Sequence, residues 1–239
     1  MDRPDSDPPS RLLQQLAQEK QRNSSGPRQT RMITIGGVEF DWQLSLIIVL
    51  GTVVPMLDYY NHGITGTKAY DRLIYYFIIP ALVILLLFRE PLAAYGFQIG
   101  NWRTGLMWTA IGCAGMAVVL WFVARSPAMT EYYQARAAGN AWRIIYFTGV
   151  DLFGWEFIWR GLWLFGLARV LGPGPAIFLQ AVPFAFMHLG KPEVETLSTI
   201  FGGVAFGYVA WRSGSFVYPW LIHWFIAAFT QIIATGRLG

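Results

Sequence analysis

Long apolar segments, separated by short polar connections, occupy most of this chain from residue 42 onward. Several approach the ~20 residues that a helix needs to cross the hydrocarbon core of a bilayer. Lipid offers no partners for backbone N–H and C=O groups, so each spanning segment is expected to be an α-helix. We therefore predict an all-α fold, a polytopic membrane helix bundle with about seven transmembrane helices. The apolar segments are 42–57, 73–88, 105–124, 144–171, 175–188, 196–211 and 216–234.

The composition supports a membrane protein whose partner is the lipid bilayer. Hydrophobic residues make up 54% of the 239 residues and charged residues only 13%, whereas soluble domains carry about 25% charged residues. The length suits one compact helical domain. No basic patch is interleaved with stacking aromatic residues, so nucleic acid is not an expected partner. The single cysteine, Cys113, excludes an internal disulfide.

The beginning of the chain differs from the rest. Residues 1–31 are polar and rich in Gln, Ser, Pro and Arg, which predicts a disordered basic tail before a transmembrane domain at 32–239. Basic residues beside a first span favour a cytoplasmic N-terminus. We expect the protein in the cell membrane, that is, the inner or plasma membrane. His62 is interpreted as a solvated loop histidine, and the polar connection 126–142 is expected to cover one mouth of the bundle.

Three charged residues lie inside the fourth apolar segment, in the sequence DLFGWEFIWR: Asp151, Glu156 and Arg160. A charge at membrane depth costs roughly 2.5 to 3.5 kcal/mol on insertion scales, so it is expected to face protein, to pair, or to do chemistry. Glu156 and Arg160 are four residues apart and share one helix face. We predict that they pair, with the arginine fork binding the carboxylate. An ion pair with a purely structural role is the alternative.

Two histidines on later segments make a functional site the stronger hypothesis. His188 ends the sequence PFAFMH, and His223 lies inside the last apolar segment. Rare ionisable residues that can converge inside a membrane protein indicate a functional site. Glu195 follows His188 across a predicted chain reversal, which could bring its carboxylate beside the histidine. Its alternative place is the first turn of a new helix, where the helix dipole favours carboxylates.

These segments resemble the CAAX prenyl protease type II family, also called CPBP or Abi intramembrane proteases. The family motifs are EExxxR, FxxxH and HxxxN or HxxxD on successive membrane helices. WEFIWRG resembles the first motif, with Glu156 at the second glutamate and Arg160 at the arginine. FAFMH matches the second motif through Phe184 and His188, and HWFIA resembles the third through His223. The resemblance covers the CPBP-like core at 144–234.

Two positions depart from the family pattern. Trp155 occupies the first glutamate, which the family uses as its main catalytic acid, and Ala227 occupies the final Asn or Asp. A water-activating carboxylate must then come from Glu156, Glu195 or Asp151, or the protein is inactive. We predict that Glu156 is essential and that Glu195 is the helper or replacement base. Asp151 lies one helical turn before Trp155, provided that the helix continues past Gly154.

The resemblance implies an intramembrane endopeptidase in which a carboxylate activates water, assisted by His188 and His223, while Arg160 positions Glu156. The expected substrate is a peptide or a lipidated protein. No cofactor is expected; the alternative is a zinc ion held by Glu156, His188 and His223, although the chain contains no HExxH.

Two other classes of protein compete with the enzyme. One is a non-catalytic family member that binds peptides or lipidated proteins, in an immunity or chaperone-like role. The other is a small transporter, for which the sequence offers neither an internal repeat nor a pair of broken helices.

Overall fold

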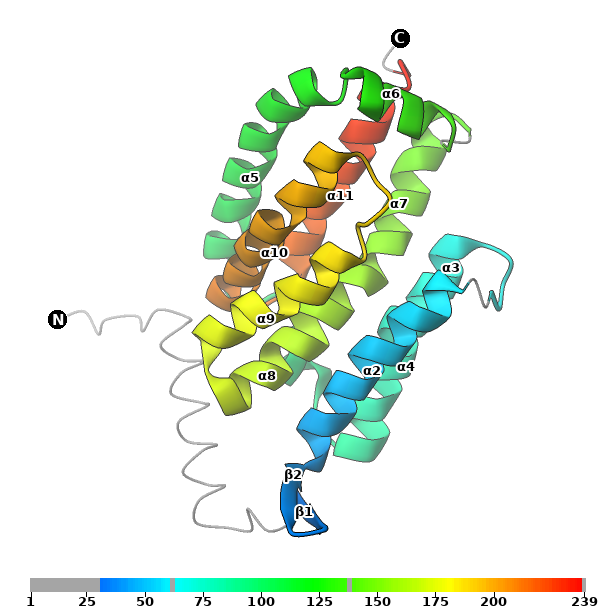
Figure 1. Cartoon of the computed structure of the whole chain (residues 1–239). Helices are drawn as coiled ribbons and strands as arrows, with labels where there is room; N and C mark the ends of the chain where they lie inside the picture. Colours follow the sequence, from blue (N-terminus) through cyan, green and yellow to red (C-terminus); the bar gives the residue numbers. More distant parts are fainter. Residues whose placement is uncertain (1–30, 61–62, 137–138, 238–239) are drawn as a thin grey trace, which may run out of the picture.

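A computed structural model describes residues 31–60, 63–136 and 139–237 (Figure 1). The predicted tail at 1–31 lies outside these residues except for Arg31, and so does His62. Arg31 is already part of the folded domain, because its Nη2 donates to Glu90 Oε1 at 2.6 Å.

The described chain begins with a small β-hairpin that the all-α prediction missed. Strands β1 (Met32–Ile35) and β2 (Val38–Asp41) pair antiparallel. The two-residue turn between them, Gly36 and Gly37, has positive φ angles of 59° and 82°. Such a turn matches the twist of paired strands and requires residues that tolerate positive φ. Asp41 then caps the first helix, since its side chain accepts from the N–H groups of Gln43 and Leu44.

All seven apolar segments form helices, which confirms the predicted all-α membrane bundle. Two of these segments contain π-helical stretches between their α-helical parts. The second apolar segment is one continuous rod with π-helical stretches at η2 and η3, and the fourth contains the π-helical stretch η5. The elements are α2 (Trp42–Tyr59), α3 (Lys68–Leu73), η2 (Ile74–Ile78), α4 (Ile79–Leu82), η3 (Val83–Phe88), α5 (Trp102–Val123), α7 (Ala141–Glu156), η5 (Phe157–Trp163), α8 (Leu164–Leu171), α9 (Pro173–Phe186), α10 (Glu193–Ser213) and α11 (Val217–Ala234).

Among the described residues, 4 helices are long and apolar enough to cross a membrane: Trp42–Tyr59, Lys68–Phe88, Trp102–Val123 and Val217–Ala234. The chain is therefore an integral membrane protein. That the other three helical segments also cross the bilayer stays a prediction.

Two shorter helices lie in the connections, η4 (Leu92–Tyr95) and α6 (Pro127–Gln134). Helix α6 lies at the end of the bundle near the C-terminus, and the hairpin lies at the opposite end (Figure 1). Met129 and Tyr133 of α6 form a small apolar cluster with Ala234 of α11. Within the polar connection 126–142, helix α6 thus caps this end of the bundle.

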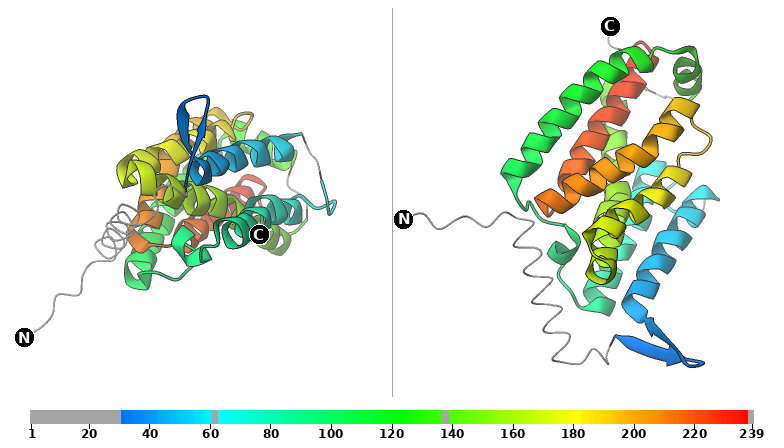
Figure 2. Two further views of the ribbon diagram at one scale, coloured as in Figure 1. Left: turned by 90° about the horizontal axis from the view of Figure 1, so that it is seen from below. Right: turned by 60° about the vertical axis from the view of Figure 1, so that its left-hand side comes forward.

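The continuous stretch α7–η5–α8 runs through the middle of the bundle. Helices α5, α10 and α11 lie on one side of it, and α2 with the α3–η3 rod lies on the other (Figure 2). Helix α11 is attached to α7 by two indole N–H groups, because Trp220 and Trp224 donate to the carbonyls of Gly149 and Ile145 at 3.0 and 2.8 Å. This packing buries η5 from Phe157 to Leu162 between neighbouring helices, so a charge on this stretch must find a partner there.

Close packing also joins α9 to α10. A Cβ atom on Gly203 would lie 2.8 Å from that of Ala181, and one on Gly207 would lie 2.6 Å from Gln180 Nε2. Small residues let the two backbones approach, as is usual between membrane helices.

Candidate active site

Glu156 and Arg160 pair as the four-residue spacing predicts. Arg160 Nη1 donates to Glu156 Oε1 at 3.1 Å, and both side chains are fully buried. The predicted two-pronged fork is not formed. The second nitrogen, Nη2, lies 3.5 Å from the carbonyl oxygen of Gly203, and Arg160 Cζ lies 3.9 Å above the ring of Phe184. The cation is therefore held by one carboxylate, one backbone carbonyl and the rings of Phe184 and Phe206.

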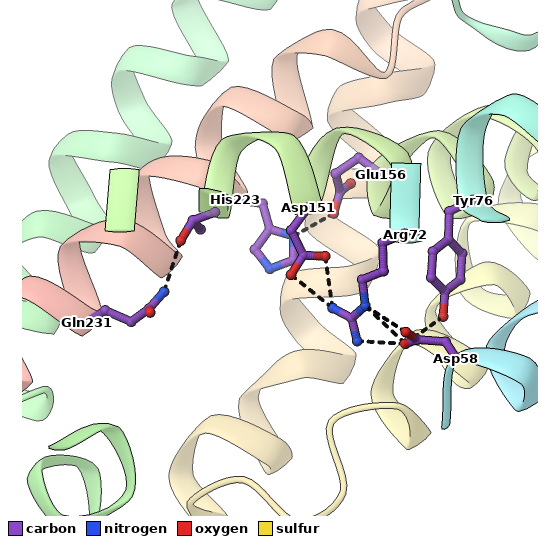
Figure 3. A network of polar contacts seen from close by, with 8 residues as sticks. Asp58, Arg72, Tyr76, Asp151, Glu156, His223 and Gln231 are labelled. Atoms are coloured by element: carbon purple, nitrogen blue, oxygen red, sulfur yellow. Dashed lines mark hydrogen bonds and ion pairs between the residues drawn. The ribbon is translucent and has the colours of Figure 1, made fainter. Parts of the chain in front are cut away.

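His223 of α11 completes this buried cluster. Its Nδ1 lies 2.6 Å from Glu156 Oε1, the same oxygen that binds Arg160 (Figure 3). An ionised carboxylate only accepts hydrogen bonds, so Nδ1 carries the hydrogen and Nε2 is left for other partners. Glu156 thus fixes both the orientation and the tautomer of the histidine, which is how buried carboxylates position imidazoles in catalytic triads.

His188 is oriented by the backbone of its own helix. Its Nδ1 donates to the carbonyl oxygen of Phe184 at 2.7 Å, which again leaves Nε2 for other partners. The Phe184 ring contacts His188, with 4.7 Å between ring centroids, and also His223, at 5.7 Å. The FxxxH spacing therefore has a physical reason, because one phenylalanine supports both imidazoles and the Arg160 cation. The two imidazole centroids are 6.4 Å apart.

Both histidines line a cavity of about 800 Å³. Tyr132 and Tyr133 of α6 belong to its wall, so the connection that was expected to cover one mouth of the bundle does lie there. Glu156 is not part of the wall and reaches the cavity only through His223. Ala227, at the position of the family's Asn or Asp, lines the cavity without a polar group.

Glu195 lies in the first turn of α10, with its carboxylate turned away from His188. Oε2 accepts from the Tyr133 hydroxyl at 2.7 Å, and Oε1 accepts from Lys191 Nζ at 2.6 Å. The chain reversal instead brings Thr196 to His188, where the threonine hydroxyl donates to the histidine carbonyl at 2.9 Å. Burial raises the pKa of the Tyr133 phenol, and the charge on Glu195 raises it further, so this contact keeps its proton at neutral pH. Glu195 thus ties α6 to α10.

Asp151 has a partner that sequence reasoning missed. Arg72 Nη1 donates to both carboxylate oxygens of Asp151, at 3.0 and 3.2 Å. Figure 3 shows that Arg72 lies between Asp151 and Asp58. Nε and Nη2 of Arg72 bind Asp58, and the Tyr76 hydroxyl donates to Asp58 at 3.1 Å. Asp151 and Arg72 are 79 positions apart, so no local spacing could have indicated the pair.

Trp155 forms part of the cavity wall beside this second cluster. Arg72 Cζ lies 4.8 Å from the centroid of its ring, and the ring meets His188 edge-on with 5.9 Å between centroids. Position 155 therefore faces both a cation and an imidazole. The residue that departs from the family motif still occupies the place where a carboxylate could meet water.

The described residues do not arrange Glu156, His188 and His223 as a zinc ligand set. No three His, Cys, Asp or Glu side chains in the described ranges converge closely enough to hold a metal ion. Glu156 binds Nδ1 of His223 at 2.6 Å, a separation that leaves no room for an ion between them. A metal on Nε2 would lie on the far side of the ring from Glu156.

Comparison with known proteins gives one match. No curated protein and no solved structure matches this chain. The family model described as type II CAAX prenyl endopeptidase Rce1-like matches residues 135–229, the stretch that contains Glu156, Arg160, His188 and His223. The match agrees with the motifs and with their convergence at one cavity. Residues 135–229 of this chain are thus similar to the Rce1-like type II CAAX prenyl endopeptidase family, a family of proteases.

Proposed function

We propose that this protein is an intramembrane endopeptidase that hydrolyses a peptide bond with water activated by a carboxylate and assisted by His188 and His223. One observation carries the proposal: both imidazoles line the same cavity of about 800 Å³, and His223 is fixed from behind by Glu156. Peptide hydrolysis inside a membrane protein needs such a pocket, because water must reach a bond that lipid would otherwise exclude.

The two histidines suit complementary roles in the reaction, one as a hydrogen-bond acceptor and the other as a donor. A neutral His188 with its hydrogen on Nδ1 can only accept at Nε2, so it suits holding a hydrogen of the attacking water. His223 is held by Glu156 through Nδ1 and directs Nε2 away from that carboxylate; in its imidazolium form, which Glu156 would stabilise, it can donate from Nε2 to the developing oxyanion. Arg160 holds Glu156 in place through its Nη1 contact. Glu156 is then essential because it positions His223.

The substrate we propose is a peptide or a lipidated protein, and the reaction needs no cofactor. The proposal is tested with the full chain in proteoliposomes and a fluorogenic peptide that carries a farnesylated cysteine followed by three residues. Adding a zinc chelator is expected to leave the rate unchanged. A rate that the chelator abolishes and zinc restores would support the zinc alternative.

Active-site substitutions give the direct test of catalysis. Glu156→Gln, His188→Ala and His223→Ala are each expected to lower kcat/KM by about 10²–10⁴-fold, the usual contribution of acid–base groups. Glu131→Gln, on the exposed surface of α6, is the matched control and should keep the rate of the unmutated protein. Full activity in His223→Ala would contradict the proposed site.

The non-catalytic binding protein remains the second candidate because two observations favour it. Trp155 and Ala227 both line the cavity and supply neither a carboxylate nor an amide. A binding protein would retain the intact farnesylated peptide with the same affinity in the unmutated protein and in Glu156→Gln. It would release no cleaved product at any peptide concentration.

For location, we propose the cell membrane with the N-terminus in the cytoplasm. The basic residues before the first span support this orientation, since positive charge is retained on the cytoplasmic side. Replacing Cys113 with serine and placing one cysteine before Arg31 allows a test in intact cells. A membrane-impermeant maleimide should then label the protein only after the cells are opened.

A further inference from the structure

Three carboxylates were candidates for activating water, and the cavity distinguishes them. Asp151 lines the cavity together with His188 and His223. Glu156 is fully buried behind His223, and Glu195 is bound by Tyr133 and Lys191. Of the three, Asp151 is the carboxylate that water in the cavity can reach directly.

The position of Asp151 on α7 places it on the correct helix face. Helix α7 is continuous from Ala141 to Glu156, so Gly154 does not interrupt it. Asp151 therefore precedes Trp155 by one turn on nearly the same face. Trp155 contacts both Arg72 and His188, and Arg72 in turn binds Asp151. The side chains at 151 and 155 thus share one cation, and Trp155 also meets the His188 imidazole at the wall of the same cavity.

Arg72 holds Asp151 without enclosing it. Nε and Nη2 of the guanidinium donate to Asp58, and only Nη1 donates to Asp151. One cation is divided between two carboxylates, and Asp151 keeps 23% of its side chain exposed. A carboxylate oxygen accepts more than one hydrogen bond, so Asp151 retains lone pairs for water. Glu156 differs because it is fully buried: its Oε1 receives both Arg160 and His223, and its Oε2 is buried away from the cavity without a hydrogen-bond partner.

We infer that Asp151 is the catalytic carboxylate of this chain, taking over the work of the missing acid at position 155, and that Arg72 is its positioning residue. The inference rests on the proposed peptidase function. A water held by His188 loses a proton to Asp151 as its oxygen attacks the peptide carbonyl carbon. Asp151 then passes this proton to the amide nitrogen as the C–N bond breaks, which yields one carboxyl and one amino terminus. No oxidant, reductant or further reactant is required.

The test uses loss and rescue of cleavage of the farnesylated peptide. Asp151→Asn is nearly isosteric and is expected to lower kcat by about 100-fold or more with a small change in KM, in the range of a lost general base. Adding Trp155→Glu to Asp151→Asn puts a carboxylate between Arg72 and His188. The double variant should have a kcat at least about tenfold higher than that of Asp151→Asn alone. Glu131→Gln controls for the removal of a surface carboxylate.

The pH dependence separates a catalytic role from a structural one. In the unmutated protein kcat/KM should fall on the acidic side as the base is protonated, and Asp151→Asn should lack that acidic limb. Arg72→Lys keeps the charge but loses the planar fork, so kcat should decrease while KM changes little. Peptide binding to each variant, measured separately by fluorescence anisotropy, shows whether the variant is folded.

Two results would overturn the inference about Asp151 without overturning the proposed peptidase function. Near-normal cleavage by Asp151→Asn, with His223→Ala inactive, would leave the peptidase proposal standing and remove Asp151 from the reaction. An inactive unmutated protein that Trp155→Glu alone makes active would show that Asp151 does not serve as the base, although the cavity can do the chemistry. Inactivity of every variant, Trp155→Glu included, would overturn both the inference and the proposed function.

Discussion

Two ionic clusters meet α7, and they differ in what surrounds them. Glu156, Arg160 and His223 form a cluster in which the two charged side chains are sealed from the cavity behind His223, and all three lie in the family-matched range 135–229. Asp151 shares Arg72 with Asp58 at the cavity wall, and both of these partners precede that range. The first cluster fixes a histidine from behind, whereas the second presents a carboxylate to the cavity. The comparison teaches that the matched segment does not contain the whole site.

The sealed cluster should respond most strongly to the loss of one member. Arg160→Met leaves the Glu156 charge buried and is expected to destabilise the fold by about 3–5 kcal/mol. The double variant Glu156→Gln, Arg160→Met removes both charges and should recover a large part of that loss. Thermal unfolding of the detergent-solubilised protein measures both. Equal destabilisation by the single and the double variant would contradict a paired role.

The cavity cluster should lose less when its cation is removed. Arg72→Met leaves Asp58 and Asp151 without their shared donor, but water in the cavity can solvate them in part. We expect a loss of about 1.5–3 kcal/mol, the scale of hydrogen bonds to charged groups. The same unfolding assay tests it. A loss larger than that of Arg160→Met would reverse the comparison between the two clusters.

A glycine on α7 tests how closely the cavity cluster depends on helix packing. A Cβ atom on Gly154 would lie 2.7 Å from the backbone oxygen of Arg72, so α3 must shift away from α7 in Gly154→Ala. The overpacking should cost about 1–3 kcal/mol. It should also lower peptidase activity by moving Arg72.

Gly115 on α5 provides the matched control for this change. A Cβ atom there meets nothing within 4 Å, and the residue is exposed on its helix. Gly115→Ala should therefore leave the stability unchanged or raise it slightly, because alanine favours the helix. Destabilisation of both variants alike would show that the effect of Gly154→Ala is not specific to the approach of α3.

The smallest effect is expected where α6 is tied to α10. Tyr133→Phe removes the hydroxyl that binds Glu195 and should cost about 0.5–1.5 kcal/mol near neutral pH. Because burial raises the pKa of Tyr133 in the fold, its contribution is complete below the unfolded pKa of ~10 and is lost as the pH rises toward the folded value. The stability difference between the unmutated protein and Tyr133→Phe should therefore shrink above that pH. A constant difference across the alkaline range would contradict this role of Tyr133.

Sequence patterns predicted what depends on neighbouring positions. The apolar segments gave the helices, and the four-residue spacing gave the Glu156–Arg160 pair. The hairpin was missed because two strands of four residues carry little periodic signal. The Tyr133 contact of Glu195 and the Arg72 contact of Asp151 join positions 62 and 79 residues apart. Such pairs are fixed only by how the helices pack, so the choice among carboxylates could not be made before the fold was known.

The cavity is lined by residues of α6. Helix α6 lies at one end of the bundle and the β-hairpin lies at the other end (Figure 1). The orientation of the chain in the membrane therefore determines which compartment the cavity faces, and so which substrates can reach it. With the N-terminus in the cytoplasm, as proposed above, the α6 end of the cavity lies toward the opposite compartment. That orientation favours peptides from the opposite compartment among the proposed substrates, whereas the reverse orientation favours proteins lipidated in the cytoplasm. The orientation of one short hairpin thus decides which compartment supplies the substrate.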